Sequence, residues 1–251
     1  KKIVKIVEIG NSGYFHIGHG IDIGNIFQSF GYNDIEGVRL RGGFRTYHGK
    51  NDMWRIQGYT AYGFRDQKWK FGGEAKYMFN KENRFMIGAG YRKDVLQLGV
   101  QLTTDEGIMT RSFASSSVLN SGETTSMSSV NQTNVFTSIE PWKNFQVRLD
   151  ATTQNIKSAD SNLFNINYYR QGVLRDDLND TRFTTTLIFR PGIKFSTYGV
   201  DRYEMTALAT NPSLILKYTK GMGGVFNSDY NYNKLQFYYY QPVILGNWGR
   251  L

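Results

Sequence analysis

The sequence has no cysteine and few residues of the other kinds on which enzymes depend. Histidine occurs three times and proline four times in 251 residues. The absence of cysteine excludes a disulfide framework, a thiolate metal site and a thiol nucleophile. Because the histidines are few and no serine or metal-binding motif accompanies them, we expect no enzymatic activity, no metal and no cofactor.

Long apolar runs are also lacking. No segment approaches the roughly 20 apolar residues that a membrane-spanning helix needs. The amino-terminal KKIVKIVEIG has neither the apolar region nor the cleavage site of a signal peptide. These absences exclude a helical membrane protein. A membrane β-barrel remains open, because its strands are apolar only at alternate positions and so have a low mean hydropathy.

Glycine and aromatic residues, in contrast, are abundant, with 27 Gly, 17 Phe, 17 Tyr and 4 Trp. This composition argues against disorder. All-β chains of roughly 200 to 250 residues often form one domain, so we expect a single domain or barrel segment over residues 1–251. The formal net charge of +9 would suit nucleic acid, anionic lipid or an anionic solute, and does not choose among them.

Apolar residues recur at every second position, which is the period of a β-strand. In EGVRLRGGFRTY, residues 36–47, Val38, Leu40 and Phe44 alternate with arginines. The pattern recurs in residues 54–62, 69–79, 84–92, 96–102, 145–152, 164–168, 182–190, 214–218 and 235–239. Turn-forming residues separate these segments, which predicts successive antiparallel hairpins. The Ser/Thr-rich stretch around 103–134 predicts a long loop, flanked by or including a short strand pair.

Cations dominate the polar side of these segments, whereas few carboxylates share it. In a membrane barrel this side would line the lumen, because an unpaired charge is costly in hydrocarbon. The predicted lumen-lining residues are Arg39, Arg41, Arg45, Arg55, Lys70, Lys76, Arg84, Arg92 and Arg148, and the candidates for ion pairs with them are Glu36, Glu74 and Asp150. Such a lumen would favour anions or bind an acidic plug, although a solvated wall with no selective role is the simpler interpretation.

Within this set, we expect Glu36, Arg39 and Arg41 to form an ion-pair cluster that fixes the strand register.

The apolar side is rich in aromatic residues, and these concentrate near the ends of the segments. Transmembrane barrels carry aromatic girdles at both membrane interfaces, separated by about nine to eleven residues along a strand. The predicted interface residues are Trp54, Tyr62, Trp69, Phe79, Phe85 and Tyr91. Because nucleic-acid binding requires aromatic and cationic residues on the same face, we expect no nucleic-acid partner.

Three stretches carry a resemblance to a known family: DIGNIFQSFGYNDIEGVRLRGGFRT (residues 22–46), WRIQGYTAYGFRDQKWKFGGEAKYMF (residues 54–79) and GYRKDVLQLG (residues 90–99). They resemble bacterial outer-membrane β-barrel proteins of unknown function whose members carry an N-terminal carboxypeptidase-regulatory-like domain. The resemblance implies that this chain is an internal part of such a barrel, in the outer membrane of a Gram-negative bacterium. It also implies contact with the lipid bilayer and lipopolysaccharide, and with other outer-membrane or periplasmic proteins. A weaker similarity links Arg41–Phe44 (RGGF) to the outer-membrane insertase superfamily.

Together, these observations predict an all-β protein, namely an antiparallel transmembrane β-barrel or part of a larger one, with about ten to fourteen strands. The expected function is that of a non-enzymatic outer-membrane protein, either a porin-like channel or an accessory component of a larger envelope complex. Two alternatives remain open. One is an insertase-like barrel that assists outer-membrane protein assembly, and the other is a soluble β-sandwich binding module with a basic face.

Overall fold

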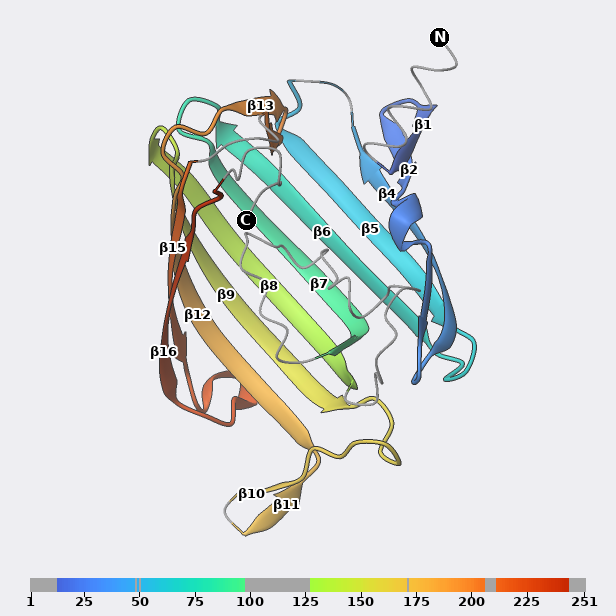
Figure 1. Cartoon of the computed structure of the whole chain (residues 1–251). Coiled ribbons are helices and arrows are strands. Elements are labelled where there is room, and N and C mark those ends of the chain that lie inside the picture. Colours follow the sequence, from blue (N-terminus) through green and yellow to red (C-terminus); the bar gives the residue numbers. More distant parts are fainter. Residues whose placement is uncertain are drawn as a thin grey trace.

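The computed structural model describes residues 13–47, 49, 51–97, 127–170, 172–205 and 211–243. In this part of the chain twelve strands form one antiparallel sheet, and two further hairpins lie apart from it. The expected all-β antiparallel fold is therefore confirmed (Figure 1). Within the same residues, no helix is long and apolar enough to cross a membrane.

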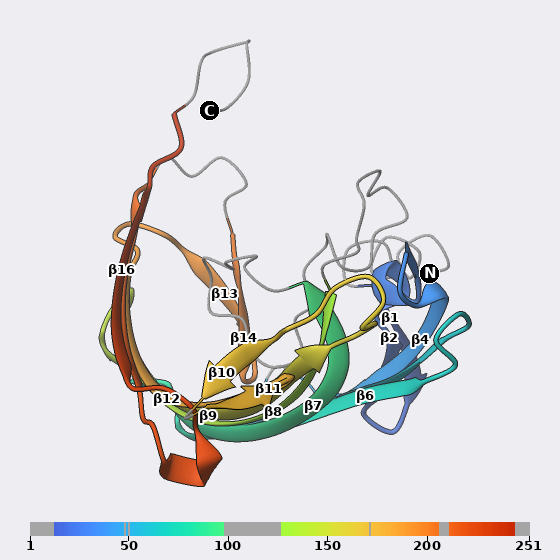
Figure 2. The same ribbon diagram turned by 90° about the horizontal axis from the view of Figure 1, so that it is seen from below.

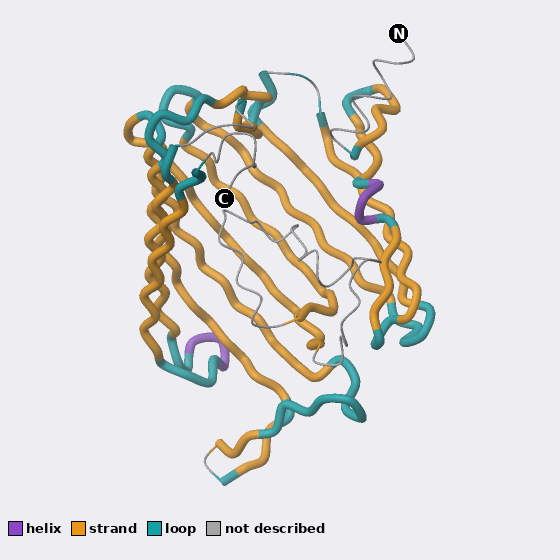
Figure 3. Tube along the Cα trace, viewed as in Figure 1, coloured by secondary structure: helices purple, strands orange, loops and turns teal. Residues whose placement is uncertain are grey.

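The sheet consists of β1 (Tyr14–Gly18), β2 (Ile21–Gly24), β3 (Phe30–Asn33), β4 (Gly37–Thr46), β5 (Trp54–Gly63), β6 (Trp69–Asn80), β7 (Phe85–Gln97), β8 (Met127–Trp142), β9 (Phe145–Ser158), β12 (Asp177–Phe189), β15 (Ser213–Gly221) and β16 (Tyr232–Tyr240). One separate hairpin is β10 (Tyr168–Arg170) with β11 (Val173–Arg175), and the other is β13 (Phe195–Tyr198) with β14 (Asp201–Glu204). Two 3₁₀ turns, η1 (Ile26–Gln28) and η3 (Val225–Asn227), lie in connections between strands. In the described part of the chain, strands alternate with loops and with the two short helical turns (Figure 3).

Strands that follow one another in sequence are neighbours in the sheet, in the order β1-β2-β4-β5-β6-β7-β8-β9-β12-β15-β16, and β3 also pairs with β4. The short turns that the sequence predicted account for the pairing of β5 with β6, β6 with β7 and β8 with β9, whereas longer connections join β9 to β12 and β12 to β15. The turn at Lys81–Arg84 joins β6 to β7, and Asn80 Oδ1 accepts hydrogen bonds from the Glu82 and Asn83 amides. Among the described residues, β16 pairs with neither β1 nor β3, so a closed barrel is not detected.

The sheet curves into a deep arc. Figure 2 shows β16 and the β1–β4 region as the two rising sides, with β7, β8 and β9 at the base. The β13–β14 hairpin, which we call the inner hairpin, lies on the concave side of this arc. The long connection between β12 and β15 contains it. The arc thus has a concave face that the chain itself partly fills, and a convex face on the other side.

The sheet exposes apolar side chains and buries charged ones, which is the reverse of the distribution in a water-soluble protein. Along β6 the side chains of Trp69, Phe71 and Phe79 are exposed, whereas those of Lys70 and Glu74 are buried. The same inversion holds in β4 and β5, where arginines are buried or half-buried between exposed apolar residues. The fully buried side chains include Arg39, Arg55, Glu36 and Asp94. Alternation in the sequence therefore produces an apolar convex face and a charged concave face.

Three inward-facing glycines are each covered by an aromatic ring from the directly paired residue of the next strand. These pairs are Gly72 with Tyr59, Gly88 with Phe136, and Gly221 with Tyr232. A Cβ placed at any of the three glycines would come within 2.6 Å of a ring atom. The abundance of glycine and aromatic residues in the composition thus has a local structural reason, since glycine lets the ring lie flat on the strand.

The expected loop around 103–134 needs a correction. Strand β8 begins at Met127, so residues 127–134 belong to the sheet. This strand is rich in Ser, Asn and Thr on both faces, which hid its periodicity, but it is held by pairing with β7 on one side and β9 on the other. The preceding part of the predicted loop, residues 103–126, lies outside the described residues.

Candidate functional site

The charged concave face is the candidate functional site. The structure places the nine predicted basic residues on it, none of them exposed. Arg39, Arg55 and Lys70 are buried. The half-buried members are Arg41, Arg45, Lys76, Arg84, Arg92 and Arg148.

Glu36, Arg39, Lys70 and Asp94 form one buried cluster, which we call the Glu36 cluster. Arg39 Nη1 lies 2.7 Å from Glu36 Oε1 and 2.8 Å from Asp94 Oδ1, and its Nη2 lies 3.1 Å from Asp94 Oδ2. Lys70 Nζ lies 3.0 Å from Glu36 Oε1. The exposed fractions of Arg39 and Glu36 are 2% and 0%. The cluster ties the β3–β4 turn to β4, β6 and β7.

Hydrogen bonds from neighbouring residues complete the Glu36 cluster. Tyr59 donates its hydroxyl proton to Asp94 Oδ2 at 2.7 Å, and Asn33 Nδ2 donates to Glu36 Oε2 at 2.7 Å. Lys70 also donates to Asp66 at 2.6 Å. Because burial of ions is costly unless they are paired and hydrogen-bonded, this arrangement leaves little freedom for any member to move.

Arg41, predicted as part of this cluster, interacts differently. Its guanidinium carbon lies 3.7 Å from the centroid of the Tyr59 ring, which is a cation–π geometry. Arg41 therefore borders the Glu36 cluster through the ring whose hydroxyl group binds Asp94.

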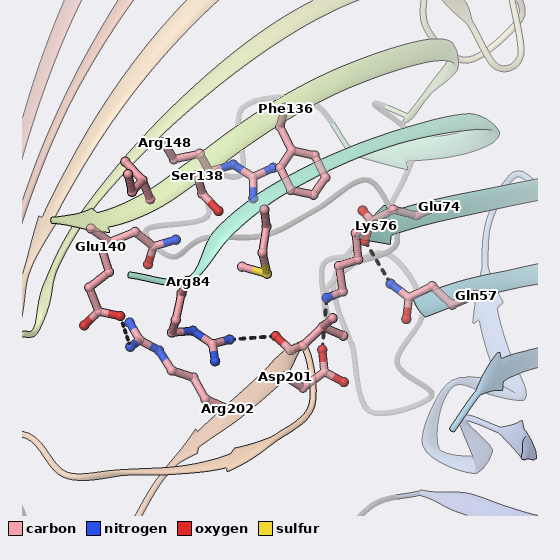
Figure 4. A pocket seen from close by; sticks show the side chains of 14 residues that line it. Gln57, Glu74, Lys76, Arg84, Phe136, Ser138, Glu140, Arg148, Asp201 and Arg202 are labelled. Carbon is pink, nitrogen blue, oxygen red and sulfur yellow. Dashed lines mark hydrogen bonds and ion pairs between the residues drawn. The ribbon is translucent and has the colours of Figure 1, made fainter. Parts of the chain in front are cut away.

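The inner hairpin provides the second charged cluster of the concave face. Asp201 Oδ2 accepts a hydrogen bond from Arg55 Nη1 at 2.6 Å, and Asp201 Oδ1 accepts one from Lys76 Nζ at 2.9 Å. Arg84 Nη2 donates to the Val200 carbonyl oxygen at 2.7 Å. Figure 4 shows the contacts of Lys76 and Arg84, whose side chains reach towards the hairpin. Strands β5 and β6 and the β6–β7 turn thus hold the tip of the hairpin.

The position of the hairpin tip depends on Gly199. Its φ of 58° suits the first central position of a two-residue hairpin turn. A Cβ at this glycine would lie 2.6 Å from the Asp52 carbonyl oxygen. Gly199 therefore permits both the turn and its close approach to the β4–β5 connection.

The charge on Asp201 depends on these contacts. Burial alone would raise the pKa of its carboxyl group, but the Lys76 ammonium and the Arg55 guanidinium more than offset this effect. The pKa of Asp201 consequently lies below its ordinary value. The carboxylate is ionised at neutral pH and neutralises part of the basic face.

A cavity of about 370 Å³ lies between the inner hairpin and the sheet (Figure 4). Its walls include Lys76, Arg84, Arg148 and Arg202 together with Glu74, Glu140 and Asp201. Arg202 pairs with Glu140 at 2.5 Å. Ser138 also lines the cavity, and in the described structure its buried hydroxyl group has no hydrogen-bond partner. The cavity is therefore polar, and its cations outnumber its carboxylates.

The two other predicted carboxylates have different partners. Asp150 pairs with Arg148 at 2.9 Å, two residues earlier on the same face of β9. Glu74 accepts a hydrogen bond from the Gln57 amide at 3.1 Å and makes no ion pair within the described residues. The sequence predicted Glu36 as a partner of Arg39 but missed its second partner, Asp94. It also missed Asp22 and Asp201, which pair with Arg45 and Arg55.

The predicted interface aromatics lie on the convex face or its border. Trp54, Trp69, Phe79 and Tyr91 are exposed, and Tyr62 and Phe85 are half-buried. Ring contacts group them with other aromatics at the strand ends. At one end Tyr62 lies 5.0 Å from Trp69, and at the other end Phe79 lies 5.7 Å from Phe85, as measured between ring centroids. The second end also carries the stacked pair of Trp142 and Phe145, with 4.5 Å between centroids.

Metal binding has no candidate in the part of the chain that the structure describes, since no three His, Asp or Glu residues there gather in a way that could hold an ion.

The fold and the site define an all-β protein with a curved antiparallel sheet, a charged concave face and an apolar convex face. The chain belongs to the family of unknown function (DUF5686), whose C-terminal domain model matches residues 9–251. Neither a curated protein nor a solved structure matches the chain.

Proposed function

We propose that this chain forms the wall of a β-barrel in the bacterial outer membrane, and that the protein is a non-enzymatic channel whose basic lumen is narrowed by the inner hairpin. In this proposal the convex face contacts lipid and the concave face lines the lumen. The members of the family that the sequence resembles are outer-membrane barrels, which agrees with this assignment.

The observation that carries the proposal is the inverted polarity of the sheet. The exposed fraction of Trp69 is 63%, whereas that of its neighbour Lys70 is 3%. Exposed apolar side chains recur across the convex face, for example Leu40, Ile56, Ile87, Val135, Leu149, Phe183, Leu216 and Phe237. A contiguous apolar face of this extent is unfavourable in water and favourable against acyl chains.

The dimensions of the convex face fit a bilayer. Trp69 and Phe79 lie near opposite ends of β6. The ten residue steps between them correspond to about 33 Å along the strand. With the tilt of about 40° that is common in membrane barrels, this becomes about 25 Å, the height of the apolar band of such barrels.

The inner hairpin supports a narrowed channel. It lies on the concave side, and Asp201 binds the two wall residues Arg55 and Lys76. The cavity that remains between hairpin and wall is polar and lined by four cations. In the proposed barrel, a solute passing through the lumen would meet this cavity, and its charge would favour anions.

The three other roles fit these observations less well. An accessory barrel without transport would need neither the cavity nor the releasable contacts of the hairpin tip. An insertase-like barrel is suggested by RGGF, but Gly42 and Phe44 lie on the convex side of β4 within regular pairing to β5. A soluble sandwich requires a second sheet over the apolar face, and no described element provides one.

The proposal is tested by placing a charge at the centre of the convex face. We expect Leu149→Arg to abolish or strongly reduce the folded protein in the outer membrane, because a midplane Arg costs about 2–4 kcal/mol in membrane barrels. Leu149 is 48% exposed on β9. Folded protein would be measured in outer-membrane fractions by the change in gel migration on heating.

Leu163→Arg is the matched control. Leu163 is 45% exposed, but lies in the connection that follows β9, outside the proposed apolar band. We expect this variant to fold like the unmodified protein. If both variants were equally abundant and soluble without detergent, the convex face would not contact lipid and the proposal would be wrong.

A further inference from the structure

Asp201, on β14 of the inner hairpin, places a negative charge next to two cations of the sheet, Arg55 on β5 and Lys76 on β6. Arg55 and Lys76 are paired residues of neighbouring strands β5 and β6, so their side chains emerge side by side on the concave face. Each of them donates to a different oxygen of Asp201. One carboxylate thus takes one hydrogen bond from each of two adjacent cations.

Arg55 has binding capacity that Asp201 does not use. The exposed fraction of Arg55 is 1%, and its Nε and Nη2 groups have no hydrogen-bond partner in the described structure. These two nitrogens form the fork with which an arginine binds two oxygens of a carboxylate or phosphate. Buried donors without partners are costly, so an anion that fills this fork would be stabilised there.

Space and further positive charge lie next to this pair. Lys76 and Asp201 line the cavity of about 370 Å³, which also receives Arg84, Arg148 and Arg202. Of the carboxylates in the cavity, Glu74 binds Gln57, and Glu140 binds Arg202. A solute in the cavity can therefore approach the contact between Lys76 and Asp201, which both line it (Figure 4). The four cations of the lining, against three carboxylates, favour an anion there.

We propose that Arg55 and Lys76 form a binding site for a small phosphate-bearing solute, that Asp201 occupies this site in the present structure, and that phosphate binding displaces Asp201 and frees the tip of the inner hairpin. We expect phosphate to bind better than a carboxylate because it has more oxygens that can accept hydrogen bonds. Both oxygens of Asp201 are already used for Arg55 Nη1 and Lys76, whereas a phosphate has further oxygens for the two Arg55 nitrogens that lack a hydrogen-bond partner. The idea that this solute arrives through a lumen rests on the proposed function.

Asp201 competes with the solute as a tethered ligand. A ligand on a short tether acts at an effective concentration in the millimolar range. Free phosphate should therefore bind the unmodified protein only at millimolar concentrations. In Asp201→Asn the competing charge is gone, and we expect phosphate to bind about tenfold more tightly or better.

The test is calorimetric titration of inorganic phosphate into the full-length protein, purified in a phosphate-free non-ionic detergent at constant ionic strength. We expect the gain in affinity for Asp201→Asn and no gain for Asp176→Asn, which removes the same charge from an exposed position. The double variant Arg55→Gln with Asp201→Asn removes both members of one ion pair, and should lose phosphate binding. If the single and double Asp201 variants bound phosphate equally, or if neither bound it, the proposal would be overturned.

Release of the hairpin is measured separately with a spin label at Thr197→Cys, since the chain has no other cysteine and Thr197 is exposed on β13. Phosphate should increase the mobility of this label, and sodium chloride at the same ionic strength should not. An equal response to both salts would show screening of charge and would contradict a specific site. Repeating the measurement in phosphatidylcholine discs with and without phosphatidylglycerol distinguishes free phosphate from a lipid headgroup, and a response to the lipid alone would overturn the assignment to a solute.

These measurements do not depend on where the protein resides. A negative titration in detergent would remove the phosphate site and leave the Leu149→Arg test unaffected. A negative Leu149→Arg test would remove the membrane location and leave the titration interpretable.

Discussion

At the scale of single residues, Arg39 has the strongest structural role on the concave face. Its guanidinium binds both oxygens of Asp94 and one oxygen of Glu36, and all three side chains are almost completely buried. Removing one member of such a cluster leaves the others as uncompensated buried charges. The cluster is therefore expected to be far more sensitive to substitution than exposed ion pairs are.

We predict that Arg39→Gln destabilises the folded protein by about 3–5 kcal/mol, because Asp94 and Glu36 then lose the buried guanidinium that pairs with both of them. Arg39→Lys should have an intermediate effect, since an ammonium keeps the charge but cannot bind two oxygens in the same geometry. The measurement is the urea midpoint in detergent, followed by the heat-dependent gel shift.

Arg65→Gln is the control, because it removes the same charge from an exposed residue of the β5–β6 turn. We expect its free energy of unfolding to change by less than about 0.5 kcal/mol. Equal midpoints for the Arg39 and Arg65 variants would show that the Glu36 cluster does not contribute to stability.

Alternation in the sequence predicted on which face each basic residue lies, and the expected pair of Arg39 with Glu36 is present, but Asp94 and Asp201 were not predicted as partners. Asp94 could have been found, since it continues the Arg92 face of β7 by one more alternation. Asp201 could not, because it belongs to a four-residue strand whose sequence has no clear period. Its contact with Arg55 spans 146 positions and depends on how a long connection folds back.

At the scale of elements, the concave face is held close-packed by pairs of a glycine and an aromatic residue on neighbouring strands. The ring in each pair occupies the volume that a side chain on the partner strand would need. These contacts lie on the inner side of a curved sheet, where neighbouring side chains converge. Small residues on that side therefore allow the curvature that Figure 2 shows.

We predict that Gly88→Ala destabilises the protein by about 1–3 kcal/mol, because the new Cβ would lie 2.5 Å from a ring atom of Phe136 and 3.0 Å from the Ala75 carbonyl oxygen. Gly42→Ala is the matched control on the convex face, since a Cβ there would meet nothing within 4 Å. Unfolding in urea measures both effects.

The Gly42 variant should be neutral or slightly more stable, because alanine has less conformational freedom in the unfolded chain. The interpretation of the glycine–ring pairs would be wrong if Gly88→Ala were as stable as Gly42→Ala.

Most long strands were predictable because one of their faces is apolar. β4, β5, β6, β7 and β9 all show this alternation in the sequence. The start of β8 was not predictable, since Ser128, Asn131 and Gln132 give it no apolar face there. Such a strand is specified by the hydrogen bonds of its two neighbours and not by its own pattern.

At the scale of the whole molecule, the connections differ between the two ends of the sheet. At one end, tight turns join β6 to β7 and β8 to β9, and the longer connection that contains the inner hairpin joins β12 to β15. At the other end, the long connection of residues 159–176, which contains the β10–β11 hairpin, joins β9 to β12. Outer-membrane barrels have short periplasmic turns and long external loops. In the proposed barrel, the tight turns therefore face the periplasm and Leu163 faces outward.

We predict that Leu163→Cys reacts with a membrane-impermeant maleimide in intact cells, and that Lys143→Cys, in the tight β8–β9 turn, reacts only after the outer membrane is permeabilised. Both positions are exposed, and the chain has no native cysteine to interfere. Labelling of Lys143→Cys but not of Leu163→Cys in intact cells would reverse the orientation. Labelling of neither in permeabilised cells would contradict the exposure of these connections.

The composition and periodicity of the sequence were sufficient to predict the all-β antiparallel fold. The curvature and the inner hairpin were not predictable, because they depend on contacts between distant segments, such as Arg84 with Val200 and Arg202 with Glu140. Closure into a barrel is a property of strand pairing at the two edges, which alternation within single strands does not specify.

The order in which the ion pairs of the concave face become available has a consequence for biogenesis. Asp94 lies 55 positions after Arg39 in the sequence, and Asp201 lies 146 positions after Arg55. Both carboxylates are therefore synthesised long after the arginines that they pair with. In the proposed barrel, a single early hairpin would bring Arg55 into hydrocarbon without Asp201, and Arg39 with Glu36 but without Asp94. If the chain forms the proposed barrel, insertion of strands one hairpin at a time is therefore unfavourable, and we expect the sheet to assemble at the aqueous boundary before it enters the bilayer.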